Sequence, residues 1–263
     1  MTDHMTKSLD ELAEEILDDG VIDADEVQRI RERIYADNII DREEADFLFK
    51  LNDGASGAAN DSSWQELFLE ALTDHVTKDA ESPGVVDADE AAYLIEKIKA
   101  DDKIDNIELA LLVNIITVAK ECHESFITFV LESAKIAVLE DGIIDDDEVE
   151  MIKKVIYGSG GGAGEGVDRA EADFLFDLND ATSGKDNSPS WKDLFVEAIS
   201  KHVLEDEVSP GVIDEDEADW FIGRIEGDET YDENEKALLL NIKATAKKIH
   251  DKLQFKMDLH NID

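Results

Sequence analysis

The feature that most constrains the fold of this chain is that its second half repeats its first. Residues 44–49 and residues 171–176 both read EADFLF, and further matches follow at the same offset of 127 residues. In the upstream part the offset is 122, because a glycine-rich segment near residues 158–166 occurs only in the second half, where we expect a flexible linker. Similarity at a fixed offset is typical of repeated structural units. We therefore expect two domains, residues 1–127 and residues 128–263.

A shorter acidic repeat lies inside each half. The long form, G-[VI]-[VI]-D-x-D-E, occurs four times, beginning at Gly20, Gly84, Gly142 and Gly211. A short form, D-x-x-E after an apolar or aromatic residue, alternates with it and begins at Asp41, Asp105, Asp168 and Asp232. An aspartate that caps a helix, with a glutamate three residues later that bonds back to it, forms a capping box. Each motif therefore predicts the first turn of an α-helix.

Apolar residues after the motifs recur at helical spacing. After the first long motif they are Val27, Ile30 and Ile34, three or four positions apart as one face of a helix requires. Strand-like alternation is hardly seen, and two of only three prolines, Pro83 and Pro210, occupy matching turns where one helix can end before the next. The predicted fold class is all-α, a duplicated helical bundle in which each half is built of repeated helix-turn-helix units.

The composition favours some partners and excludes others. The 263 residues include 67 Asp and Glu against 25 Lys and Arg, and the resulting net charge of −42 repels nucleic-acid phosphates and anionic membranes. Cations and basic proteins are the expected partners. No apolar stretch is long enough to cross a bilayer, and the acidic amino terminus lacks the pattern of a secretion signal, so we expect a cytoplasmic protein without a membrane span.

The long motifs contain more acid than a capping box needs. The glycine permits a positive φ, and a further aspartate enters the first helical turn, where like charges already crowd together. Hard oxygen ligands in a flexible turn suit Ca²⁺, or Mg²⁺ that keeps several waters. The candidate metal ligands are Asp19, Asp23, Asp25, Glu26, Asp79, Glu81, Asp87, Asp89, Glu90, Asp141, Asp145, Asp147, Glu148, Asp206, Asp214, Asp216 and Glu217.

The second long motif is the closest of the four to an EF-hand calcium loop. When its glycine is aligned with the loop glycine, Asp79 and Glu81 take the first and third ligand positions. Asp87 and Glu90 then take the ninth and twelfth positions, whereas Pro83 occupies the fifth. None of the four motifs is a regular EF-hand.

The motifs resemble those of the tellurite-resistance TerB-like domains. A DG-[VI]-I-D-x-D-E turn at residues 19–26 and at residues 141–148 carries the resemblance, together with E-x-A-L-L at residues 108–112 and 235–239. In the other two long motifs a proline stands in place of the aspartate before the glycine. The resemblance implies one all-helical domain in each half, acidic residues that bind metal, and a role in stress-response complexes.

Other reactive side chains have simpler interpretations. His75 and His202 occupy matching places near the ends of helices that we expect to be capped by Ser63 and Ser190, and a structural role is the expected one. The single cysteine, Cys122, is interpreted as a small buried hydrophobe. No nucleophile, base and oxyanion donor stand out as a set, so we expect no enzyme activity.

The leading functional hypothesis is a non-enzymatic protein that binds divalent cations, with Ca²⁺ as the expected ion. In a second hypothesis, the acidic faces bind a basic protein or imitate the phosphates of DNA. A third treats the acid as an adaptation to high salt, without specific ion sites. The sequence does not distinguish the three or predict an oligomeric state.

Overall fold

The protein is described by a computed structural model that covers residues 5–78, 82–100, 103–158, 166–205, 209–226, 231–260 and 262. Within these residues it contains thirteen α-helices and four strands of two residues each, so the predicted all-α class is confirmed. Most of the glycine-rich segment that we expected to be a linker lies outside the described residues. No helix in the described part is long and apolar enough to cross a membrane.

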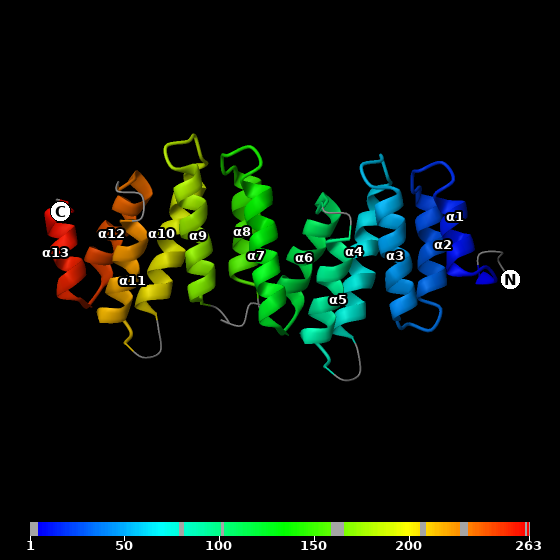
Figure 1. Ribbon diagram of the computed structural model, residues 1–263, viewed down its shortest axis with the longest axis horizontal. Coiled ribbons are helices and arrows are strands. Elements are labelled where there is room, and N and C mark those ends of the chain that lie inside the picture. The colour runs from blue at the N-terminus through cyan, green and yellow to red at the C-terminus, as the bar shows by residue number, and fades with distance from the viewer. Residues whose placement is uncertain are drawn as a thin grey trace. The chain divides into compact units, whose positions relative to one another are not determined.

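The chain divides into two compact units, residues 1–130 and residues 131–263. The point of division lies within α7 (Glu124–Val138), close to the end of the first predicted domain. In each unit successive helices run in alternating directions and are joined by loops at the two ends of the unit (Figure 1).

The first unit is organised around its fourth helix. That helix packs against α2, α3 and α6, while α1 packs against α3. The helices are α1 (Leu9–Ile16), α2 (Ala24–Ile34), α3 (Arg42–Gly54), α4 (Ser62–Thr77), α5 (Ala88–Ile98) and α6 (Asn106–Val118). Trp64 and Phe68 of α4 are fully buried, as their helical spacing predicts, and Phe68 meets Phe49 of α3 edge to face at 5.5 Å.

The second unit has a central helix in the same position. Here α10 packs against α8, α9 and α12, while α11 packs against α13. The helices are α8 (Asp146–Ile156), α9 (Arg169–Thr182), α10 (Pro189–Leu204), α11 (Glu215–Ile225), α12 (Glu233–Thr245) and α13 (Asp251–Leu259). Trp191 and Phe195 of α10 are buried, and Phe195 lies 5.2 Å from Phe176 of α9.

Two short parallel pairings, which the sequence did not predict, join turns that are distant in the chain. β1 (Val85–Val86) pairs with β2 (Glu121–Cys122), and β3 (Val212–Ile213) pairs with β4 (Lys248–Ile249). The residues between the motif glycine and the capping aspartate are extended, so their backbone groups are free to bond to another segment. Each pairing therefore holds the start of α5 or α11 against the segment before α7 or α13.

Candidate functional site: acidic turns at helix N-termini

All eight acidic motifs form helix N-caps. In the first, Asp23 Oδ1 accepts a hydrogen bond from the N–H of Glu26 at 2.8 Å, and Glu26 Oε2 accepts one from the N–H of Asp23 at 3.0 Å. The same reciprocal pair occurs at the starts of α2, α3, α5, α6, α8, α9, α11 and α12. The capping-box prediction is therefore confirmed for each motif, and this bonding accounts for two of its carboxylates.

The four motif glycines all have the backbone conformation that the sequence suggested. Their φ angles are 76° at Gly20, 87° at Gly84, 76° at Gly142 and 80° at Gly211. Residues with a side chain rarely adopt these angles, so glycine is required to turn the chain into each capping aspartate.

The turns before α2 and α8 are fixed by asparagine side chains. Asn60 Oδ1 accepts a hydrogen bond from the N–H of Ile22 at 2.8 Å, and the N–H of Asp61 donates to the carbonyl of Ile22 at 2.9 Å. Asn187 Oδ1 bonds the N–H of Ile144 in the same way at 2.9 Å. These bonds place the start of α2 beside the start of α4, and the start of α8 beside that of α10.

The same region corrects two predicted caps. α4 is capped by Asp61 and α10 by Ser188, not by Ser63 and Ser190. The helices begin earlier than predicted because these upstream oxygens accept hydrogen bonds from the first-turn backbone N–H groups, including that of Ser63 at 3.0 Å.

The turns before α5 and α11 carry a cation of the chain itself. Lys120 Nζ donates to the carbonyl of Pro83 at 3.0 Å, and Lys247 Nζ donates to that of Pro210 at 3.0 Å. The lysine stems lie so close to the turns that a Cβ added to Gly84 would come within 2.9 Å of Lys120 Cε. The turn that most resembles an EF-hand in sequence therefore has an ammonium group beside it.

The turns before α2 and α8 bring like charges together without such a lysine. The pKa of Glu26 is raised, first by burial and then by the carboxylates of Asp23 and Asp19. Glu148 has a raised pKa for the same reasons, with Asp145 and Asp141 beside it. Like-charge crowding, expected from the sequence, is thus present at these two turns.

The structure does not assemble the candidate ligands into a metal centre within its described residues. No group of three or more His, Cys, Asp or Glu side chains in that part of the chain could hold a metal ion. Asp19 and Asp141 each accept a hydrogen bond from the backbone of their own turn. In each long motif the aspartate two residues after the capping aspartate is exposed to solvent. These residues are Asp25, Asp89, Asp147 and Asp216. Three further candidates lie outside the described residues, Asp79, Glu81 and Asp206.

Sequence reasoning missed that the glutamates of the short motifs are buried. Their exposed fractions are between 1% and 8%, at Glu44, Glu108, Glu171 and Glu235. Burial raises the pKa of Glu171 to about 8, whereas that of Glu44 rises to about 6, with Arg33 Nη1 at 3.7 Å from its carboxylate. At the offset of 122, Val155 stands where Arg33 stands in the first unit. The apolar residues that surround these glutamates in the sequence were the available signal.

The two matching histidines bond to the backbone just ahead of the short motifs. His75 Nδ1 lies 2.7 Å from the carbonyl oxygen of Ile40, and His202 Nδ1 lies 2.8 Å from that of Val167. Because a carbonyl can only accept, each Nδ1 carries the proton. Burial lowers the pKa of His202, which favours the neutral ring. Each histidine thereby supports the turn that leads into α3 or α9.

Comparison with known proteins adds no relative. No family model, curated protein or solved structure matches this chain. The resemblance to TerB-like domains therefore rests on the short motifs alone and stays a prediction.

Proposed function

We propose that the protein is a non-enzymatic acidic binding module that binds a basic protein through charge. The supporting observation is a group of exposed aspartates at one end of the first unit, here named the acidic edge, formed by Asp19, Asp23, Asp25 and Asp61. The hydrogen bond from Asp61 to Ile22 holds its two turns together, and Figure 1 shows the loops before α2 and α4 at the same end of the unit.

Capping leaves most of this negative charge available. Each helix N-terminus contributes a partial positive charge of roughly one half, so two helix starts offset only part of the charge of four carboxylates. Across the chain, 67 acidic residues stand against 25 basic ones. Binding of this kind steers a cationic partner at long range and weakens as salt screens the charges.

The first prediction concerns the acidic edge. Replacing Asp19, Asp23 and Asp25 together by asparagine should weaken the binding of an oligolysine peptide by roughly tenfold, because exposed charges contribute up to about 1 kcal/mol each. Asparagine caps helices as well as aspartate does, so α2 should keep its start. Fluorescence anisotropy with labelled peptide at low salt measures the affinity.

A matched control separates a local site from bulk charge. The triple replacement of Glu14, Glu43 and Glu66 by glutamine removes the same charge from other helical positions of the first unit and should change the affinity by less than about threefold. If both triple variants lost the same affinity for oligolysine, binding would follow the total charge and not the acidic edge. Absence of saturable binding, with equal stabilisation by KCl and CaCl₂ at matched ionic strength, would favour salt adaptation instead. Competition with DNA for a basic DNA-binding protein tests the mimic version.

A second candidate function is divalent-cation binding at the turns before α2 and α8, with Ca²⁺ as the first ion to test. The specific support is the raised pKa of Glu26 and Glu148 beside two aspartates each, at glycines that no lysine covers. The resemblance to TerB-like domains points the same way. An ion there would keep several waters, because the carboxylates do not close into a full ligand set.

The four turns make an internal comparison for calcium. We expect calorimetric titration with CaCl₂ to give saturable heat that is lost in the double variant Asp19→Asn, Asp141→Asn. The double variant Asp87→Asn, Asp214→Asn should keep that heat, because Lys120 and Lys247 already supply positive charge beside those turns. No heat at millimolar calcium, or equal loss in both double variants, would reject this candidate.

A further inference from the structure

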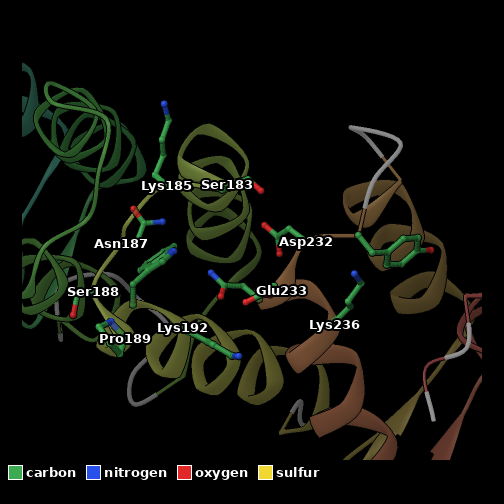
Figure 2. Close-up of a pocket in the computed structure, with 13 residues that line it drawn as sticks. Ser183, Lys185, Asn187, Ser188, Pro189, Lys192, Asp232, Glu233 and Lys236 are labelled. Carbon is green, nitrogen blue, oxygen red and sulfur yellow. The ribbon is translucent and has the colours of Figure 1, made fainter.

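A cavity of about 440 Å³ lies in the second unit, between the turn that joins α9 to α10 and the start of α12 (Figure 2). Its volume falls within the range of roughly 300–1,000 Å³ that is usual for small-molecule sites. Three lysines line it from three different elements: Lys185 from the turn, Lys192 from α10 and Lys236 from α12. In Figure 2 the side chain of Lys185 stands at the rim and extends outward.

Within the described residues the charges of these lysines are not engaged in ion pairs, as is also the case for Lys154 and Lys248 of the same unit. In contrast, Lys153 and Lys201 of that unit each pair with a glutamate of their own helix. Two carboxylates also line the cavity, Asp232 and Glu233. Both oxygens of Asp232 are already engaged, by the N–H of Glu235 and by Asn179 Nδ2.

The first unit shows that this charge is specific to one copy. At the offset of 127 the three lysine positions hold Ala58, Gln65 and Leu109. Asp61 stands in place of Ser188, and isoleucines stand in place of Tyr231 and Asn234. The corresponding positions therefore carry two aspartates in the first unit but three lysines against Asp232 and Glu233 in the second. Their formal charge changes from −2 to +1.

A buried donor in the cavity wall also lacks a partner. In the first unit Trp64 Nε1 donates to Asn52 Oδ1 at 3.4 Å. In the second unit, the equivalent oxygen, Asn179 Oδ1, accepts a hydrogen bond from Asn234 Nδ2 at 2.8 Å. The fully buried Trp191 therefore has no hydrogen-bond partner for its Nε1 among the described residues. A buried N–H without an acceptor costs about 1–3 kcal/mol, so this wall of the cavity holds an unsatisfied donor that the first unit does not have.

We propose that this cavity binds a small organic anion with more than one carboxylate or phosphate group. The lysines supply positive charge from three elements, with Lys185 at the rim, and the aromatic residues Trp191 and Tyr231 also line the cavity. Such binding runs against the net charge of −42, so long-range attraction to the whole chain cannot produce it. This cavity is a different site from the acidic edge, and the proposal does not depend on the function proposed for the acidic edge.

The experiment follows the three tryptophan indole N–H signals by ¹H–¹⁵N NMR during titration with citrate and, separately, with pyrophosphate at constant ionic strength. We expect the Trp191 signal to shift saturably with at least one probe, while the Trp64 signal stays in place. The triple variant Lys185→Gln, Lys192→Gln, Lys236→Gln should lose affinity by tenfold or more, since three charge-assisted contacts are weakened.

A second triple variant, Lys153→Gln, Lys154→Gln, Lys201→Gln, makes the same change in net charge elsewhere in the unit and should keep the affinity within about threefold. Preserved amide spectra in both triples show that the fold is intact. An unmoved Trp191 signal with both probes, or the same loss in both triples, would overturn the proposal.

Discussion

Replacement of Glu171 by glutamine is expected to stabilise the second unit at neutral and alkaline pH. The Glu171 carboxyl is 1% exposed, and its pKa is raised from 4.5 to about 8 by burial. This difference corresponds to on the order of 5 kcal/mol at pH well above 8, where the folded protein has to hold a buried carboxylate. Glutamine keeps the capping box but stays neutral.

The direction of the pH dependence follows from the raised pKa. Because folded Glu171 holds its proton more tightly than the unfolded chain does, its contribution to stability is complete below pH 4.5 and is lost as pH rises through about 8. The free energy of unfolding of the wild type should fall over this window more steeply than that of the Glu171→Gln variant. Denaturant unfolding at a series of pH values measures both curves, and ¹³C NMR of the side-chain carboxyl measures the pKa directly.

The first unit supplies the control. Glu44 occupies the matching place, but Arg33 lies beside it and its pKa is raised only to about 6. Glu44→Gln should therefore give a smaller change, and its effect should be complete at a lower pH. A measured Glu171 pKa near 4.5 would show that this carboxyl is not buried in the folded protein. Parallel curves of unfolding free energy against pH for Glu171→Gln and the wild type would show the same.

Trp64→Ala is expected to destabilise the first unit by about 3–5 kcal/mol, the usual cost of removing a large buried aromatic side chain. Trp64 is fully buried in α4, which packs against α2, α3 and α6, and its ring lies 5.7 Å from that of Phe68 at a tilt of 52°. The loss should appear as faster amide hydrogen exchange in these four helices. Native-state exchange measured by mass spectrometry resolves them from α10 in the same molecule.

An exposed aromatic residue tests whether burial is the cause. Phe255 in α13 is 66% exposed, so Phe255→Ala should change stability by no more than about 0.5 kcal/mol. Trp191→Ala should destabilise α8, α9, α10 and α12 by less than Trp64→Ala destabilises their counterparts, because it also removes a buried N–H that has no hydrogen-bond partner among the described residues. Similar small effects for all three variants would mean that α4 and α10 are not the centres of their units.

The helix starts were predictable because their chemistry is local. A capping box needs only an aspartate and a glutamate three residues apart, so the sequence alone located eight helix N-termini. The positive φ at the motif glycines followed from the same reasoning. In contrast, the caps of α4 and α10 were predicted two residues too late, at Ser63 and Ser190, whereas the structure has Asp61 and Ser188. Several polar residues compete there for the same backbone N–H groups.

The features that were missed depend on residues distant in the sequence. Lys120 follows α6 in the sequence and reaches the turn at Gly84 from there. The EF-hand-like spacing around Gly84 therefore could not predict an ammonium group beside that turn. The cavity lysines of the second unit were also overlooked, although comparing the two copies position by position shows where they replace Ala58, Gln65 and Leu109. Differences between repeats carried information that the shared motifs did not.

The most direct test of the proposed function is to map where a cationic partner contacts the molecule. Isotope-labelled protein, residues 1–263, titrated with oligolysine at low salt should give saturable amide shifts concentrated in residues 19–26 and 60–63, around the acidic edge. The shifts should disappear as KCl is raised. Shifts spread evenly over all acidic helix starts, or no saturable shift at all, would contradict the account.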